Sequence, residues 1–236
     1  KKHTKGNITM SYQLKSNWLP ADKYALKAPY PMTPEGLIVH NTAGSASAME
    51  EAQAMCTNDS AVSFHVVIDE ENAVECIPFS RNAFHAGDGS AGYANRHLIG
   101  LEIARSMDAE SDRFDRAEAN AAEYIAHVCL QYGWTSAQLH QHNWYSATEC
   151  PHRTKAHWSD FLAKVDANIA ELRAQASANP AAPATPAKIA LCIDNKNTEV
   201  RGENKNGTVY VSARDLLEAL GYSVSWEDGQ VVASLK

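Results

Sequence analysis

Residues 37–44 read Leu-Ile-Val-His-Asn-Thr-Ala-Gly, and they follow a loop that contains Pro29, Pro31 and Pro34. A short apolar run bounded by loop-forming residues is typical of a buried β-strand, so we expect a strand over 37–40. His40 ends this strand and begins a polar loop, and loops at strand ends often carry functional residues. The alternative is a strand-end histidine that makes a single hydrogen bond.

The pattern of residues 7–173 predicts an α/β unit. Two apolar segments, 62–68 and 73–77, flank a turn-like stretch and predict a hairpin. Helical periodicity alternates with the strands, and one helix is expected to stop before Gly133. The expected strands are 37–40, 62–68, 73–77 and 98–103, and the expected helices are 47–56, 117–132 and 157–173. This alternation favours a mixed central β-sheet flanked by helices.

A change in composition divides the chain. Residues 174–187 read AQASANPAAPATPA, without a charged or a large apolar side chain. Such a segment cannot bury a core and its prolines favour extended conformations, so we expect a linker over 174–187. It separates a domain at 7–173 from a small α+β domain at 188–236. The small domain has expected strands at 188–193, 208–211, 223–226 and 231–235 and a helix at 213–220.

Charge and hydropathy argue against several classes of protein. The 236 residues include 21 Lys and Arg against 28 Asp and Glu, a net charge of −7, which disfavours a nucleic-acid-binding protein. No apolar run approaches the roughly 20 residues that span a bilayer, so membrane insertion is not expected. Five irregularly spaced cysteines do not indicate a disulfide framework, and no signal peptide is evident; we therefore expect synthesis in the cytoplasm.

Residues 140–152 read HQHNWYSATECPH and hold the strongest chemical signal. The imidazole of His142 and the thiolate of Cys150 are ligands suited to zinc. A catalytic zinc site uses three protein ligands and one open position, and two histidines with one cysteine satisfy that number. A buried cysteine that only packs before a proline is the alternative.

Three further residues are candidates for chemistry. Glu102 lies inside the apolar run 98–103, where a buried carboxylate is costly unless it is paired or functional, and it could act as a general base. The alternative places Glu102 on a solvent-facing side of the strand. His65 and His85 lie among apolar residues, where a histidine is often a hydrogen-bonded core residue.

Five segments, taken in order, resemble the zinc-dependent N-acetylmuramoyl-L-alanine amidases of the type-2 amidase family. The segments are 38–43 (IVHNTA), 63–67 (SFHVV), 84–87 (FHAG), 99–103 (IGLEI), and 142–152, which runs from His142 to Cys150-Pro151-His152. The family includes phage endolysins and shares its fold with peptidoglycan recognition proteins. The resemblance covers about residues 15–172 and implies a zinc hydrolase of bacterial peptidoglycan.

The resemblance also implies roles for single residues. The zinc ligands would be His40, His142 and Cys150, Glu102 would activate the zinc-bound water, and His85 would lie near the substrate. We also place His65, Thr148 and Trp144 among the expected substrate contacts, although simple packing is an equal alternative for Trp144. Phe64 stands where some members carry a tyrosine, and Thr148 where many carry a lysine, so a catalytic hydroxyl and a cation are missing.

Residues 208–214 (TVYVSAR) and 220–226 (LGYSVSW) resemble a copper amine oxidase N-terminal-like stalk domain, a module often attached to cell-wall proteins. Wall binding and a plain spacer are equal expectations for it. For the whole chain we expect hydrolysis of the amide between N-acetylmuramic acid and L-alanine, as in an endolysin made in the host cytoplasm; a processed secreted autolysin is the other origin. The competing functions are a non-catalytic peptidoglycan-binding protein and a Cys–His hydrolase with Cys150 as nucleophile.

Overall fold

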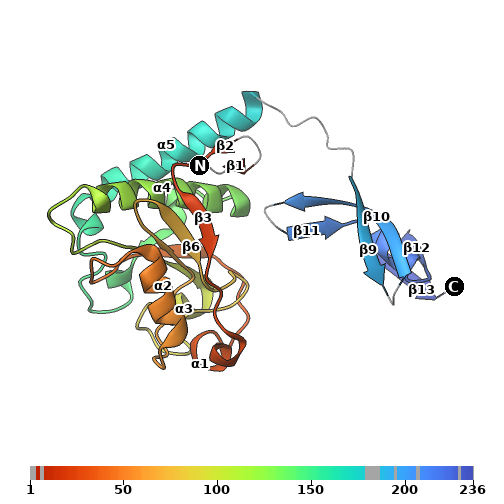
Figure 1. The fold of residues 1–236 in the computed structure, drawn as a ribbon, viewed down its shortest axis with the longest axis horizontal. Coiled ribbons are helices and arrows are strands. Elements are labelled where there is room, and N and C mark those ends of the chain that lie inside the picture. The colour runs from red at the N-terminus through yellow and green to blue at the C-terminus, as the bar shows by residue number, and fades with distance from the viewer. Residues whose placement is uncertain are drawn as a thin grey trace. The chain divides into compact units, whose positions relative to one another are not determined.

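The computed structural model describes residues 4–5, 8–178, 187–193, 196–205, 208–227 and 230–235. The chain divides into two compact units, Lys1–Ala178 and Asn179–Lys236 (Figure 1). The first unit contains a mixed β-sheet with helices on both faces, which confirms the predicted fold class.

Six strands form the central sheet in the order β3-β6-β5-β7-β4-β8. All neighbouring strands run parallel except β5 and β6, which form the predicted antiparallel hairpin. The strands are β3 (Gln13–Ser16), β4 (Gly36–Asn41), β5 (Val66–Ile68), β6 (Asn72–Glu75), β7 (Leu98–Ile103) and β8 (Leu139–Gln141), and a separate pair, β1 (Thr4–Lys5) and β2 (Ile8–Thr9), precedes them.

The hairpin is shorter than predicted at both outer ends, and β6 stops at Glu75 instead of residue 77. The first strand was expected from residue 62, but β5 begins at Val66 because the preceding residues pair elsewhere. The backbone N–H of Ser63 donates to the carbonyl of Phe84, and Val62 is 64% exposed. Residues 62–64 therefore lie outside the hairpin, whereas the His65 backbone still hydrogen-bonds to Gly100 and Cys76.

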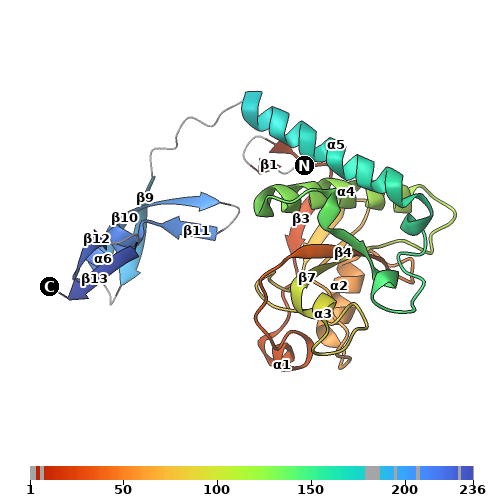
Figure 2. The same ribbon diagram turned by 180° about the vertical axis from the view of Figure 1, so that it is seen from behind.

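Two long helices cover one face of the sheet and shorter helices cover the other (Figures 1 and 2). On the first face, α4 (Arg113–Tyr132) packs against α5 (Trp158–Ala178), with Phe114, Ile125 and Phe161 in the core between them and the strands. On the second face lie α2 (Ala48–Thr57) and α3 (Tyr93–His97), while α1 (Tyr24–Lys27) precedes β4. None of the described helices combines the length and apolar character that crossing a membrane requires.

Alternation along β4 decides which side chains reach which face. Leu37 and Val39 join the core beneath α4 and α5, whereas Ile38 packs in a separate cluster with Ala86 and Leu98. Because successive side chains of a strand point to opposite faces, His40 shares the face of Ile38. The long helices therefore cover the back of the sheet and leave His40 on the other side.

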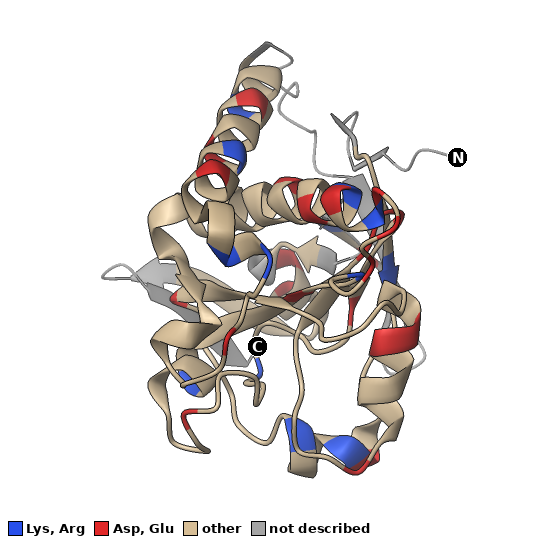
Figure 3. Ribbon diagram, turned by 90° about the vertical axis from the view of Figure 1, so that its left-hand side faces the viewer, with Lys and Arg blue, Asp and Glu red and all other residues tan. Residues whose placement is uncertain are grey.

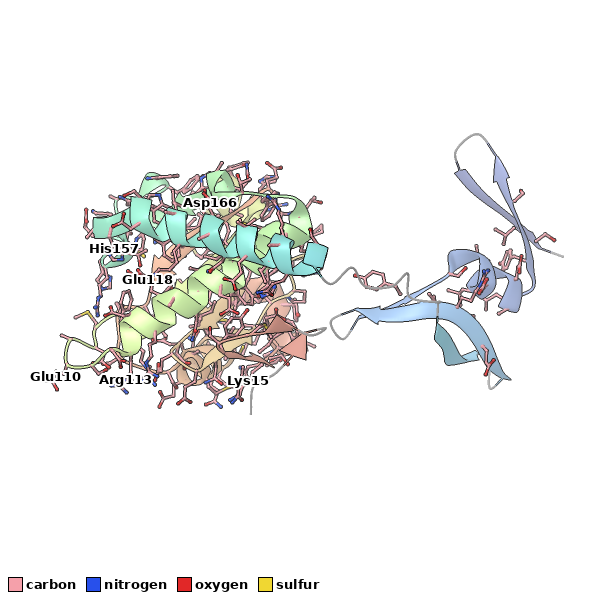
Figure 4. All side chains as sticks on the ribbon, turned by 90° about the horizontal axis from the view of Figure 1, so that it is seen from above. Lys15, Glu110, Arg113, Glu118, His157 and Asp166 are labelled. Atoms are coloured by element: carbon pink, nitrogen blue, oxygen red, sulfur yellow. The ribbon has the colours of Figure 1, made fainter. Side chains whose placement is uncertain are left out.

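Local signals set the helix ends. The side chain of Ser47 accepts from the backbone N–H of Glu50, and the Glu50 carboxylate accepts from the backbone N–H of Ser47, which forms a capping box at the start of α2. α4 ends at Tyr132 and is capped by Gly133, whose left-handed φ of 73° suits glycine. Glu118 on α4 accepts from His157 Nε2 at 2.9 Å, next to the start of α5 (Figure 4). Charged residues lie mainly on helices and loops (Figure 3).

The long helix α5 extends further than predicted. It continues to Ala178, so residues 174–178 of the expected linker are helical. Alanine and glutamine are strong helix formers, and the segment has no proline before Pro180. The rest of the predicted linker, up to residue 186, lies outside the described residues.

The second unit combines a three-stranded antiparallel sheet, a helix and a two-stranded pair. The sheet has the order β11-β10-β9, and α6 begins after Ser212, whose side chain caps the backbone of Asp215. The elements are β9 (Ala187–Ile193), β10 (Lys196–Lys205), β11 (Thr208–Val211), α6 (Ala213–Ala219), β12 (Tyr222–Glu227) and β13 (Gln230–Leu235). The long strand β10 was not predicted, because KNTEVRGENK is polar and lacks an apolar run.

Candidate metal centre

Two neighbouring strands place the first pair of site residues side by side. β4 and β7 run parallel, and their register sets His40 directly beside Glu102. The two neighbours of Glu102 on β7, Leu101 and Ile103, enter the core under α4, so Glu102 lies on the opposite face together with His40. The predicted alternative, with Glu102 on a solvent-facing side, is wrong, because its side chain is only 17% exposed.

A loop brings Cys150 to the end of β4. The backbone N–H of Asn41 donates to Cys150 Sγ at 3.4 Å. The Asn41 side-chain oxygen accepts from the backbone N–H groups of Arg153, at 2.9 Å, and Thr154, at 3.1 Å. His142 follows β8, which is paired with the other edge of β4. Three segments that are distant in the sequence therefore meet at one strand end.

The ligand atoms of His40, His142 and Cys150 all lie within 4.8 Å of one another. Cys150 Sγ is 3.8 Å from His40 Nδ1, near the roughly 3.5 Å that tetrahedral zinc imposes between a sulfur and a nitrogen ligand. Nε2 of His142 and Oε2 of Glu102 are buried and have no hydrogen-bond partner among the described residues. Two imidazoles, a thiol and these unpaired atoms fit a zinc ion.

Burial shifts the pKa values of the candidate ligands His40 and Cys150. It lowers the pKa of His40 well below its usual value, with the neighbouring His85 and His142 adding to the effect, so the ring is neutral and can offer a lone pair. Burial and the nearby Glu102 raise the pKa of Cys150 to about 12. Such a thiol is protonated at neutral pH without a cation, which disfavours the Cys–His hydrolase. A bound metal ion would deprotonate it.

Glu102 has the environment of a proton acceptor. Its Oε1 lies 3.9 Å from His40 Nδ1. Burial, with a smaller contribution from the Glu51 carboxylate, raises the pKa of Glu102 to about 8. A carboxyl with a pKa close to neutrality can both accept and release a proton during a reaction.

His65 and His85, the two predicted histidines that are not candidate ligands, have different surroundings. His65 is completely buried, with Nδ1 accepting from the backbone N–H of Gly100 at 2.9 Å and Nε2 donating to the carbonyl of Arg81 at 2.9 Å. With both nitrogens paired to backbone groups, His65 is a core residue and has no ring nitrogen left for the predicted substrate contact. His85 lies beside the candidate ligands, and its Nδ1 is within hydrogen-bond distance of His40 Nε2, at 3.0 Å.

A cavity of about 530 Å³ adjoins His142. Of the two residues that the sequence predicts as further substrate contacts, Thr148 lines this cavity and Trp144 does not. Trp144 is 55% exposed, and its ring packs edge-on near His140 and Trp158 instead. The lining residues are Ala61, Val62, Phe84, His85, Gly87, Gly89, Ser90, Asn95, His142 and Thr148.

Sequence reasoning missed three residues that build the site. Asn41 holds the Cys150 loop, Asn95 holds the backbone around His85, and Gly100 leaves room for the His85 ring. Only Gly100 had a readable signal, since a glycine inside a strand often marks a close approach. The partners of the two asparagines are remote in sequence, so no local pattern identifies them.

The chain is similar in sequence and in structure to known proteins. XlyB of Bacillus subtilis (strain 168), an N-acetylmuramoyl-L-alanine amidase, is 36% identical over 75% of this chain, which spans 56% of that relative. CwlA of a Bacillus species, with the same activity in its name, is 32% identical over 92% of this chain and 86% of its own length. The structure of PlyL matches with a TM-score of 0.62 and 36% identity, covering 65% of this chain and 97% of PlyL.

The family model for N-acetylmuramoyl-L-alanine amidase matches residues 30–153. These residues include β4, the loop of Cys150 and every lining residue of the cavity. The chain therefore belongs to the Amidase_2 family of N-acetylmuramoyl-L-alanine amidases.

Proposed function

We propose that the protein is a zinc-dependent amidase that hydrolyses the bond between N-acetylmuramic acid and L-alanine in peptidoglycan. The observation that carries the proposal is the convergence of His40, His142 and Cys150 beside the buried carboxyl of Glu102. The names of XlyB and CwlA support the same activity.

The reaction has two difficulties, because an amide is a poor electrophile and water is a poor nucleophile at neutral pH. Zinc held by His40, His142 and Cys150 would polarise the carbonyl and lower the pKa of bound water to about 7. Glu102 accepts the proton of the attacking water and delivers it to the leaving nitrogen. Its raised pKa makes both steps accessible near neutrality.

The cavity beside His142 is the proposed site for substrate groups next to the scissile bond. Ala61, Val62 and Phe84 provide an apolar wall, and Ser90 and Thr148 supply hydroxyl groups. Thr148 can donate a hydrogen bond there, but it cannot supply the positive charge of a lysine.

Mass spectrometry of digested peptidoglycan tests the reaction. The enzyme should release stem peptides with a free L-alanine amino group, and chelation of zinc should abolish this product. New reducing ends without new amino groups would identify a glycosidase. Binding to peptidoglycan without any cleavage by zinc-loaded protein would support the non-catalytic alternative instead.

We propose that the chain acts on the cell wall in the manner of an endolysin, with residues 188–236 as a wall-binding module or a spacer. The separate compact unit at the C-terminus supports an independent role. Sedimentation with purified cell walls tests it, comparing the full chain with a chain that ends at residue 178. Equal binding by the two proteins would leave the spacer role.

A further inference from the structure

His85 is held in a fixed position beside His40, with its Nδ1 3.0 Å from His40 Nε2. Its ring lies against Gly100 of β7, where an added Cβ would come within 2.6–2.9 Å of three ring atoms. Contacts this short exclude any larger residue unless the ring moves, so the strand leaves a recess for this imidazole. The recess lies on the face of the sheet that carries His40 and Glu102.

The loop that carries His85 is also held in place. The backbone N–H groups of His85 and Ala86 both donate to the side-chain oxygen of Asn95 at 2.8 Å. The carboxylate of Asp88 in turn accepts from the backbone N–H groups of Ala94, at 2.7 Å, and Asn95, at 3.3 Å. The position of the ring is therefore set by two layers of hydrogen bonds.

Two contacts determine where the protons of the histidines sit. His85 Nε2 lies 3.0 Å from the carbonyl oxygen of Leu98, which can only accept, so Nε2 carries the hydrogen. The His85 ring is buried, where a charged imidazolium is costly, so the ring is neutral and its Nδ1 is an acceptor. His40 Nε2, 3.0 Å away, must then be the donor.

The consequence reaches the metal-facing atom. With its hydrogen on Nε2, neutral His40 has a lone pair on Nδ1, the atom that lies near Cys150 Sγ and Glu102 Oε1. Metal-binding histidines usually donate their other N–H group to an acceptor that orients the ring and increases its basicity. Here the acceptor is a second histidine, which accepts only because the Leu98 carbonyl has fixed its own tautomer.

We propose that His85 is a positioning residue that holds His40 in the Nε2–H tautomer and thereby sets the affinity of the site for zinc. This assignment rests on the proposed zinc centre. It differs from the substrate contact expected from the sequence, because both ring nitrogens of His85 are already occupied.

Variants of His85 can show whether zinc affinity depends on the hydrogen bond that His85 accepts from His40 or only on the packing of its side chain. His85→Leu fills the recess but removes the acceptor for His40, and we expect zinc to bind about 10–100-fold more weakly. His85→Asn places an amide oxygen near the former Nδ1, and it should restore most of the affinity. Affinities are measured by competition with a chromophoric chelator, and cobalt absorption spectra report whether the ligand geometry is retained.

His65 provides a matched control. It is buried, both its nitrogens pair with backbone groups, and its ring centroid is 5.9 Å from that of His85, yet no hydrogen bond joins it to a metal ligand. His65→Leu should lower the unfolding temperature while zinc affinity stays close to that of the wild type. Equal weakening of zinc binding by the His65 and His85 substitutions would reduce His85 to a structural role.

A measurement on the wild-type protein avoids any dependence on the variants. Long-range ¹H–¹⁵N spectra of the zinc-free chain at neutral pH should show both His40 and His85 protonated at Nε2 and bare at Nδ1. A His40 ring protonated at Nδ1 would overturn the proposal, as would equal affinity in His85→Leu and wild type. Zinc binding that follows the prediction without amidase activity would refute only the proposed function, and a wild type that binds no zinc would refute both.

Discussion

Replacing Glu102 by glutamine should stabilise the zinc-free protein. The same substitution should remove most of the amidase activity of the zinc-loaded protein. The carboxyl is buried beside His40, and its Oε2 has no hydrogen-bond partner among the described residues. Burial, followed by the charge of Glu51, raises its pKa from 4.5 to about 8. Glutamine has the same shape and no charge, so the substitution removes the cost of ionisation and little else.

The size of the effect follows from the pKa. One pKa unit corresponds to about 1.4 kcal/mol, so the ionised carboxylate costs the folded, zinc-free protein about 5 kcal/mol at most. The raised pKa means that the folded state holds the proton more tightly than the unfolded chain. Stability from this group is therefore complete below pH 4.5 and is lost as the pH rises to about 8. Glu102→Gln should not show that loss.

Denaturant unfolding of the zinc-free proteins measures the difference. The free energies of unfolding of wild type and Glu102→Gln should be similar near pH 4.5, diverge as the pH rises from 4.5 to about 8, and stay apart above pH 8, with the variant more stable. Glu51→Gln makes the same chemical change at a neighbouring carboxyl and should give a much smaller difference. A stability gap that does not change with pH would refute the reasoning.

The same variant tests the catalytic role. General acid–base catalysis is typically worth about 10²–10⁴-fold, so kcat of zinc-loaded Glu102→Gln should fall by a factor in that range. Zinc content, measured by mass spectrometry, should remain that of the wild type. Loss of zinc together with activity would instead make Glu102 a ligand or a structural residue.

Other substitutions probe the ligands, the cavity wall and the core. Cys150→Ser should lose bound zinc, because a hydroxyl is a harder and less acidic ligand; metal analysis decides. Lys27→Met removes the buried ammonium that donates to Asn58 Oδ1 and to the carbonyls of Ser60 and Val62. Unfolding experiments should show a loss of about 1–3 kcal/mol and kinetics a raised KM, since Val62 lines the cavity. Gly133→Ala, at a φ of 73°, should cost about 1–2 kcal/mol in the same unfolding experiment. Phe161→Ala should cost about 3–5 kcal/mol and leave zinc affinity unchanged in the folded protein.

Local sequence patterns were enough to predict many of the helices and strands. The apolar runs that became β4 and β7 and the periodicity that became α4 were readable because burial imposes a regular alternation on each element. Elements without such a pattern were missed. β3 (QLKS) and β10 (KNTEVRGENK) are polar and owe their pairing to neighbouring strands.

The sequence by itself determined which residue types could bind a metal ion, because imidazole and thiolate chemistry belongs to the side chains of His40, His142 and Cys150. It also marked Glu102 as an unusual carboxyl inside an apolar strand. Only the tertiary structure decided that these groups share one face at one strand end, that His65 is buried away from it, and that His85 contacts His40. The physical reason is that strand register and loop closure join residues 62 to 109 positions apart, and such contacts leave no signal in any local stretch of sequence.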